Sequence, residues 1–165
     1  MFKKLFGKKE AEIKTETIAS PINGRIVSIE QVPDPTFSEK MIGDGIAIEP
    51  ADGHVVAPVE GKIVQVFPTK HAFGIETPGG AELLIHIGLE TVAMNGEGFT
   101  SHVKEGDQIK VGDPIIDFDL ELVKEKAAHT ITPIVITNHD KYTIEKVGEG
   151  ESIAGETSLF KLKLK

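Results

Sequence analysis

Two histidines, His71 and His86, have a residue type and a spacing that could support chemistry. They lie on either side of residues 77–80 (TPGG), a run of turn formers between two segments in which apolar and polar residues alternate. This pattern is typical of a β-hairpin. If Pro78 and Gly79 form the centre of the loop, His71 faces His86, and opposed residues on antiparallel strands hold their Cβ atoms about 4.5–5.5 Å apart. The hairpin therefore predicts two neighbouring imidazoles, although a one-residue bulge would break this register.

The same register predicts which residues share a face with the histidines, because successive side chains of a strand point to opposite sides. The predicted face has a hydroxyl, two imidazoles, apolar flanks and a gap, and it comprises Phe67, Thr69, His71, Phe73, Leu84, His86 and Gly88. Such a face suits a shallow site for a small polar group. A structural role for the histidines is the alternative, and spacing alone does not decide between the two.

Three chemistries fit a pair of imidazoles. They could be metal ligands, although no HExxH or HxH pattern supplies a third ligand. They could act as a general acid and a general base on a bound substrate. One could instead be a covalent nucleophile, with the other as its electrostatic neighbour. The sequence contains no phosphate-binding loop, dinucleotide fingerprint or nucleophile elbow around a serine.

Length and composition favour one domain in a reducing compartment. The chain has 165 residues, enough for a substantial core, and no cysteine for disulfides or thiolate chemistry. A net charge of −8 argues against nucleic acid as the main partner, because no basic excess is available to neutralise phosphates. Neither an apolar run long enough to span a membrane nor a secretory signal is present. We therefore expect a cytoplasmic protein.

Residues 1–17 are richer in lysine than the rest of the chain. Phe2, Leu5 and Phe6 would share one side of a helix with lysines around them. Such a segment fits contact with an anionic membrane surface, at the inner face of the membrane, but a helix this short is marginal in water. We predict a flexible lysine-rich segment over residues 1–17 and a single domain over residues 18–165.

Internal repetition indicates the fold. Residues 21–29 (PINGRIVSI) recur as residues 58–66 (PVEGKIVQV), and residues 103–113 recur in modified form as residues 147–156. Two copies of each unit indicate a duplicated strand motif within one body. The many glycine, proline and β-branched residues are typical of short strands joined by turns. The predicted fold is an all-β antiparallel sandwich or flattened barrel.

Helix is expected in one place. Residues 120–128 (LELVKEKAA) combine good helix formers with spaced apolar positions, which predicts a short helical excursion. Strands are expected over residues 46–49 and 131–137. Residues 33–45 are a turn-rich connection in which Phe37 either covers the core or lines a binding surface.

Four motifs, in order and spacing, resemble the glucose-type enzyme IIA of the bacterial phosphoenolpyruvate-dependent sugar phosphotransferase system. They are GDGIAI at residues 43–48, TKHAF at residues 69–73, LLIHIGLE at residues 83–90 and NGEGF at residues 95–99. The resemblance extends from about residue 18 to the C-terminus. It implies a phosphotransferase component with a phosphohistidine intermediate.

The resemblance also implies roles for matched residues. His86 would accept the phosphoryl group, His71 would stabilise it, and Thr69 would form a hydrogen bond in the same site. The rim for protein partners would comprise Phe37, Ile42, Phe67, Phe73, Leu84 and Glu90. Some family members carry an aromatic residue at the position of Leu84 and an aspartate at that of Glu90. These departures leave the site intact but weaken inferences about the preferred partners.

Two protein partners follow from the resemblance. The histidine-containing phosphocarrier protein (HPr) would donate the phosphoryl group, and a cysteine of the IIB domain of a sugar permease would accept it. No cofactor or metal is expected, with a zinc ion shared by His71, His86 and a partner's carboxylate as the alternative. A shallow site for protein partners suits a monomer.

Two functions of other classes stay open. The repeats are also similar to biotinyl and lipoyl carrier domains, although no Met-Lys-Met or Asp-Lys-Ala motif is present. A zinc-dependent hydrolase of the related duplicated-strand architecture would need a further ligand near His71 and His86. The mass of the protein and its metal content would test these alternatives.

Overall fold

The computed structural model describes residues 14–165, which fold mainly into antiparallel strands with a few short helices. The strands are β1 (Thr15–Ala19), β2 (Gly24–Ser28), β3 (Asp44–Pro50), β4 (His54–Val56), β5 (Gly61–Val66), β6 (Ala72–Glu76), β7 (Glu82–His86), β8 (Phe99–Ser101), β9 (Gln108–Ile109), β10 (Pro114–Phe118), β11 (Thr132–Ile136), β12 (Tyr142–Lys146), β13 (Glu151–Ser152) and β14 (Ser158–Leu164). The helical segments are η1 (Ile29–Gln31), α2 (Pro35–Ser38), η2 (Thr91–Met94), α3 (Leu120–Lys126) and η3 (His139–Lys141). The predicted all-β fold is confirmed.

An eight-stranded sheet forms the main layer, in the order β13-β2-β3-β11-β7-β6-β5-β9. The two copies of the repeated strand, β2 and β5, lie near its opposite ends, and each pairs with an outermost strand from the other repeat. A Cβ at Gly24 would lie 2.0 Å from the Glu49 carbonyl oxygen, and one at Gly61 would lie 2.4 Å from that of Glu76. The neighbouring backbone therefore requires the repeated glycine in both copies, and the duplicated motif is confirmed.

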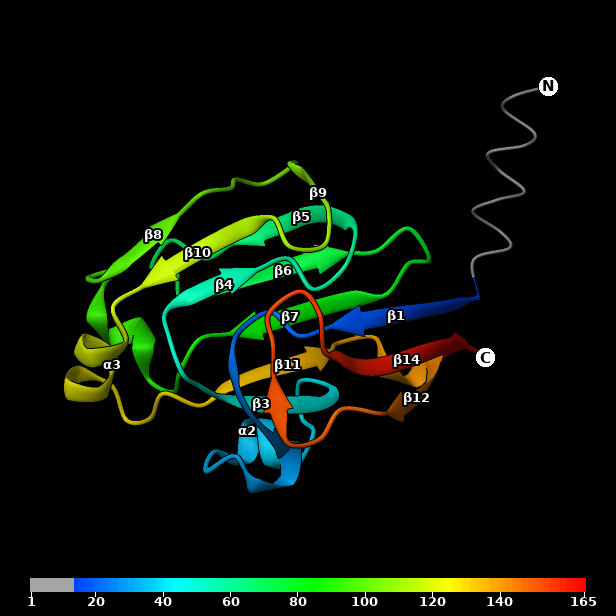
Figure 1. Ribbon diagram of the computed structural model, residues 1–165, viewed down its shortest axis with the longest axis horizontal. Coiled ribbons are helices and arrows are strands. Elements are labelled where there is room, and N and C mark those ends of the chain that lie inside the picture. Colours follow the sequence, from blue (N-terminus) through cyan, green and yellow to red (C-terminus); the bar gives the residue numbers. More distant parts are fainter. Residues whose placement is uncertain (1–13) are drawn as a thin grey trace.

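Two three-stranded sheets, β1-β14-β12 and β4-β10-β8, cover one face of the large sheet and complete a sandwich (Figure 1). The main core lies between the layers, where Ile18 and Phe160 of the small sheets belong to the same buried cluster as Phe73 and Ile85 of the large sheet. Figure 1 places α3 at one end of the molecule and the C-terminus, beside the start of β1, at the other.

The opposite face of the large sheet carries a smaller apolar cluster. Val27, Ala47 and Val135 contribute from β2, β3 and β11, and Ile29 of η1 and Phe37 of α2 cover them. Phe37 therefore covers apolar residues, which is one of the two roles predicted for it.

Helix α2 lies within the connection that was predicted to be rich in turns. The Asp34 side chain accepts a hydrogen bond from the Thr36 N–H over 3.0 Å, and Pro35 occupies the start of the helix. An aspartate cap followed by proline is a helix-start signal. The helix is only one turn long and has too few residues for an apolar period, so the prediction missed it.

The remaining predicted elements agree with the structure. Helix α3 matches the predicted excursion, and its cap is Asp119, which accepts a hydrogen bond from the Leu122 N–H over 3.1 Å. Strands β3 and β11 match the predicted strands. Among the described residues, no helix is long and apolar enough to cross a membrane.

The predicted boundary at residue 18 is too late. Strand β1 starts at Thr15 and pairs with β14 through Thr15–Lys163 and Thr17–Lys161. Residues 15–17 therefore belong to the folded domain. Residues 1–13 of the predicted flexible segment, with its proposed membrane-facing side chains, lie outside the described residues.

Candidate functional site

The hairpin that carries the histidines has a three-residue loop, residues 78–80. The Thr77 N–H donates to the Ala81 carbonyl over 2.9 Å, and Gly80 has a left-handed φ of 91°. Three-residue hairpin loops commonly end in such a left-handed residue. The loop is longer by one residue than the two-residue centre used in the prediction, and the register is shifted accordingly.

Ala72, rather than His71, therefore lies opposite His86. A one-residue shift moves every side chain of a strand to the other face of the sheet. Phe73 accordingly pairs with Ile85 and is fully buried in the main core. The predictions that Phe73 lies beside the histidines and belongs to a partner-binding rim are wrong.

His71 nevertheless contacts His86, because it lies in the loop before β6 and not within the strand. Lys70 has a left-handed φ of 61°, and its N–H donates to the Phe67 carbonyl over 2.7 Å, which turns the chain at residues 67–70. The two imidazole centroids are 4.9 Å apart and the ring planes are inclined by 80°. The predicted pair is confirmed, although a loop and a strand form it.

The two ring nitrogens of His86 are chemically distinct. Nδ1 lies 2.7 Å from the carbonyl oxygen of Gly88. Because a carbonyl can only accept, Nδ1 carries the ring proton and Nε2 has a free lone pair. Burial lowers the pKa of His86, and the Gly88 carbonyl and the Asp34 carboxylate oppose this effect. A neutral ring with a free Nε2 can act as a nucleophile.

His71 is buried, with only 4% of its surface exposed. Its Nδ1 forms a hydrogen bond with Thr69 Oγ1. Burial, together with electrostatic repulsion from His86, lowers the pKa of His71 to about 4. His71 is therefore neutral near pH 7, and when the Thr69 hydroxyl donates to Nδ1, the ring proton is on Nε2. This arrangement provides a neutral N–H donor next to His86.

Two phenylalanines enclose the imidazoles. The Phe37 ring lies 5.2 Å from that of His86 between centroids, and the Phe67 ring lies 5.4 Å from that of His71. Phe37 is only 3% exposed and so supports His86 from within. Its predicted place in an exposed partner-binding rim is wrong. Phe67 is half-buried, as a rim residue would be.

The other rim residues are accessible. Ile42 and Leu84 are half-buried and pack against the smaller apolar cluster. Glu90 is exposed and has a left-handed φ of 61° at the start of η2. Their predicted role in partner binding stays a prediction.

The gap expected beside Gly88 is filled. A Cβ at Gly88 would lie 2.7 Å from Thr91 Cγ2 and 2.8 Å from the His129 carbonyl oxygen. The φ of Gly88 is 70°, in the left-handed region that favours glycine. Gly88 is therefore required by its tightly packed turn.

The sequence interpretation missed Asp34, whose carboxylate is close enough to His86 to oppose the lowering of its pKa by burial. Asp34 and Glu90 line one hollow between the start of α2 and the turn after β7, with Pro33, Pro35, Leu89 and Ala128. The order Asp34-Pro35 is a helix-cap signal that could have indicated an aspartate in a fixed position. Asp34 thus lies near His86, and Glu90 lines the same hollow as Asp34.

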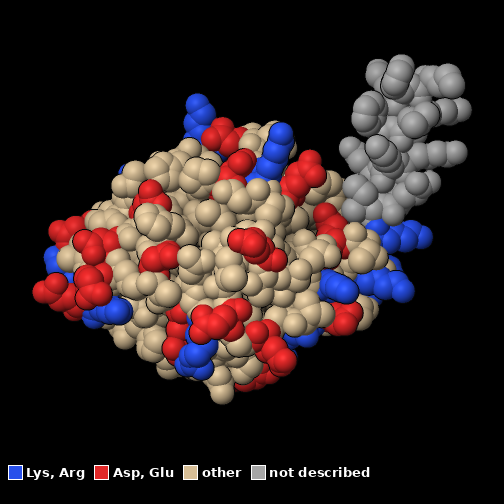
Figure 2. Space-filling model, viewed as in Figure 1, with Lys and Arg blue, Asp and Glu red and all other residues tan. Residues whose placement is uncertain are grey.

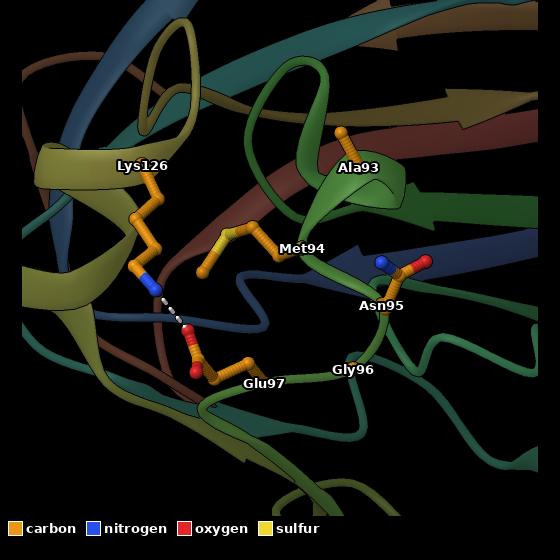
Figure 3. A pocket seen from close by; sticks show the side chains of 6 residues that line it. All are labelled: Ala93, Met94, Asn95, Gly96, Glu97 and Lys126. Carbon is orange, nitrogen blue, oxygen red and sulfur yellow. Dashed lines mark hydrogen bonds and ion pairs between the residues drawn. The ribbon is translucent and has the colours of Figure 1, made fainter.

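A second hollow, drawn in Figure 3, is lined by residues 93–97 and by Lys126 of α3. In Figure 3, the Lys126 side chain of α3 reaches across to pair with Glu97, and the Met94 side chain points from the end of η2 toward α3. A Cβ at Gly96 would lie 3.6 Å from the Thr69 carbonyl oxygen, so this loop packs behind Thr69. Neither histidine lines this hollow. Within residues 14–165, no three histidine, cysteine or acidic side chains gather as a metal site.

Comparisons with known proteins show the family of the chain. The family model of the phosphoenolpyruvate-dependent sugar phosphotransferase system, EIIA 1, matches residues 16–142. The glucose-specific EIIA component from Halalkalibacterium halodurans is 64% identical over 99% of each chain, and that from Bacillus cereus is 54% identical over the full length of both. The glucose permease IIA from Mycoplasma capricolum has a TM-score of 0.86 and 42% identity, covering 91% of this chain and 97% of its own. The chain therefore belongs to the EIIA 1 family of the phosphoenolpyruvate-dependent sugar phosphotransferase system.

Proposed function

We propose that the chain carries the phosphoryl group of the sugar phosphotransferase system on Nε2 of His86. The observation that supports this atom is the 2.7 Å bond from His86 Nδ1 to the Gly88 carbonyl. That bond retains the ring proton on Nδ1, so the lone pair of Nε2 is free at neutral pH. An imidazole of this kind can accept a phosphoryl group and pass it on.

The proposed transfer needs no group beyond donor and acceptor. Nε2 of His86 forms a bond to phosphorus while the phosphorus–nitrogen bond of the donor breaks, and that electron pair returns to the donor imidazole. Phosphoryl transfer of this type depends mainly on positioning and on electrostatic stabilisation of the phosphoryl oxygens. The pair of neutral imidazoles is suited to this, and no metal or cofactor forms part of the proposal.

We assign His71 and Thr69 to stabilisation of the phosphoryl group. Thr69 orients the His71 ring through Nδ1, which leaves its Nε2–H as a donor toward the oxygens of a phosphoryl group on His86. A neutral donor is suitable because burial disfavours a charged ring at this position. Each such donor stabilises charge that develops during transfer.

HPr as the donor and the IIB domain of a sugar permease as the acceptor are the proposed partners. Glucose is the sugar named for the two relatives described above, and we propose a glucose-type permease for this chain. Ile42, Phe67, Leu84 and Glu90 would contact the partners, and a dry apolar contact would favour transfer over hydrolysis. Acidic side chains are spread over the face in Figure 2, as the net charge of −8 implies, which suits partners with basic surfaces. We further propose a monomer that acts in the cytoplasm.

The alternatives from other classes receive less support. The lysine next to the site, Lys70, is in a left-handed turn within TKHAF, and the family match concerns a phosphocarrier and not a biotinyl or lipoyl domain. A zinc hydrolase would need a third ligand, and none accompanies His71 and His86 in the described part of the chain.

The proposal is tested by incubating the protein with phosphoenolpyruvate, enzyme I and HPr, followed by assignment of the phosphohistidine by ³¹P and ¹⁵N NMR. We expect one phosphate, on Nε2 of His86. Phosphate on His71 would reverse the two roles. No phosphate, in a reaction where HPr itself is charged, would overturn the proposed carrier function.

A further inference from the structure

The peptide group between Gly88 and Leu89 is held at both ends. Its C=O accepts the Nδ1 proton of His86 over 2.7 Å, and its N–H donates to the His129 carbonyl over 2.9 Å. In a trans peptide, the C=O and the N–H lie in one plane and point in opposite directions. The bond to His129 therefore fixes the direction in which the Gly88 carbonyl points.

Thr91 closes the turn that contains this peptide. Its side chain is fully buried, and its Oγ1 donates to the Ile87 carbonyl over 2.6 Å. Its Cγ2 packs against Gly88, where a Cβ would be only 2.7 Å away. The hydroxyl thus ties the end of β7 to the first residue of η2 and limits rotation of the peptides between them.

His129 fixes the other side of the turn. Its Nδ1 accepts a hydrogen bond from the Ile131 N–H over 2.9 Å, a local bond of the kind that Asx side chains use to hold a turn. The Ala128 N–H also donates to the Leu89 carbonyl over 3.1 Å. The His129 carbonyl is therefore held in place to receive the Leu89 N–H.

We infer that Thr91 and His129 are positioning residues for phosphoryl transfer, and that they act through the Gly88–Leu89 peptide to keep the proton of His86 on Nδ1. This inference rests on the proposed role of His86. If the peptide could rotate, Nδ1 would lose its acceptor and the proton would be shared between both ring nitrogens. Fewer molecules would then present a free Nε2.

The substitution Thr91→Val tests the inference, because it keeps the side-chain shape and removes the hydroxyl. We expect the initial rate of phosphorylation by phospho-HPr to fall about five-fold, the effect of one lost neutral hydrogen bond. The ¹⁵N shifts of the His86 ring should move from the Nδ1–H form toward a mixture of tautomers. Thr91→Ser keeps a hydroxyl and should restore both the phosphorylation rate and the ¹⁵N shifts of the His86 ring. Ser152→Ala is the control. It removes another buried hydroxyl, which donates to the Ile22 carbonyl over 2.9 Å, and it should change neither the phosphorylation rate nor the His86 ¹⁵N shifts.

A second pair of variants covers the case in which Thr91→Val does not fold. His129→Ala removes the acceptor for the Ile131 N–H, whereas His129→Asn supplies another at a similar place. We expect the His86 tautomer to change in His129→Ala and to return in His129→Asn. Unchanged His86 ¹⁵N shifts in folded His129→Ala and Thr91→Val would overturn the inference. Failure of the unsubstituted protein to accept phosphate on His86 would instead overturn the proposed function, so the two failures are distinguishable.

Discussion

The ring of His71 is nearly perpendicular to that of His86, at 80°, with the centroids 4.9 Å apart. Burial lowers the pKa of both rings, so the two imidazoles are neutral neighbours near pH 7. Their backbone and hydroxyl partners differ, because His86 Nδ1 bonds to the Gly88 carbonyl and His71 Nδ1 bonds to Thr69. Two identical side chains can therefore perform different roles, one as nucleophile and one as donor.

Replacing His86 by glutamine is expected to abolish phosphorylation by phospho-HPr. Glutamine lacks the ring nitrogen that forms the bond to phosphorus. Incorporation of acid-labile phosphate, followed by mass spectrometry, measures the effect. His54→Gln is the control, because the His54 side chain is 75% exposed and belongs to β4 in a small sheet. Normal phosphorylation of His86→Gln would contradict the assignment of the nucleophile.

Replacing His71 by glutamine is expected to leave His86 able to accept phosphate but to slow onward transfer to the IIB domain. Loss of one positioned donor to developing charge typically reduces a rate by about 10²-fold or more. Single-turnover transfer from the isolated phosphoprotein to the IIB domain measures onward transfer separately from phosphorylation by phospho-HPr. If phosphorylated His71→Gln transferred at the normal rate, the assisting role of His71 would be wrong.

The sequence predicted the duplicated strand motif and the imidazole pair, because repeats and turn residues are local signals. It did not predict the exact register of the hairpin. The loop of residues 78–80 depends on the left-handed φ of Gly80, and TPGG offers two glycines that can adopt it. The choice between them depends on burial, since the observed register puts Phe73 and Ile85 in the core.

Local sequence signals also could not predict which of the rim residues are buried. Phe37 lies in a connection that the sequence predicts to be rich in turns, but the one-turn helix α2 packs it against His86 and the outer face of the large sheet. Contacts of this kind join residues that are far apart in the chain, and the periodicity of the sequence does not predict them. Asp34 was missed for the same reason, since its effect on His86 depends on where α2 packs.

Replacing Gly88 by alanine is expected to destabilise the fold by about 3 kcal/mol or more, the range of mutations that combine a clash with backbone strain. The new Cβ would meet Thr91 Cγ2 at 2.7 Å and the His129 carbonyl oxygen at 2.8 Å, at a φ of 70°. Gly106→Ala is a matched control, because Gly106 has a φ of 95° and no heavy atom within 4 Å of the new Cβ. It should lose only about 1 kcal/mol from the left-handed backbone. Urea unfolding measures the free energy of unfolding of both variants. Equal losses of stability would contradict the prediction and show that the turn around Gly88 relaxes to accommodate the methyl group.

The stability of the protein is expected to fall in mild acid partly because of His71. Its pKa is lowered from 6.5 to about 4 in the folded state, so between these values the unfolded chain binds more protons. Stability therefore rises with pH through this window, is complete above pH 6.5 and decreases as the pH falls toward 4. When the pH falls from 7.5 to 4.5, the shifted pKa of His71 alone lowers the free energy of unfolding by about 2 kcal/mol.

The substitution His71→Gln isolates this contribution, because the carboxylates that titrate in the same range are common to both proteins. Urea unfolding at pH 7.5 and pH 4.5 should show a smaller loss of stability in the variant than in the unsubstituted protein, by about 2 kcal/mol. An identical acid loss in His71→Gln would mean that the folded protein protonates His71 near its ordinary pKa. A minority of the molecules would then carry a charged His71 ring near pH 7, so the neutral N–H donor proposed for phosphoryl transfer would not be present in all of them.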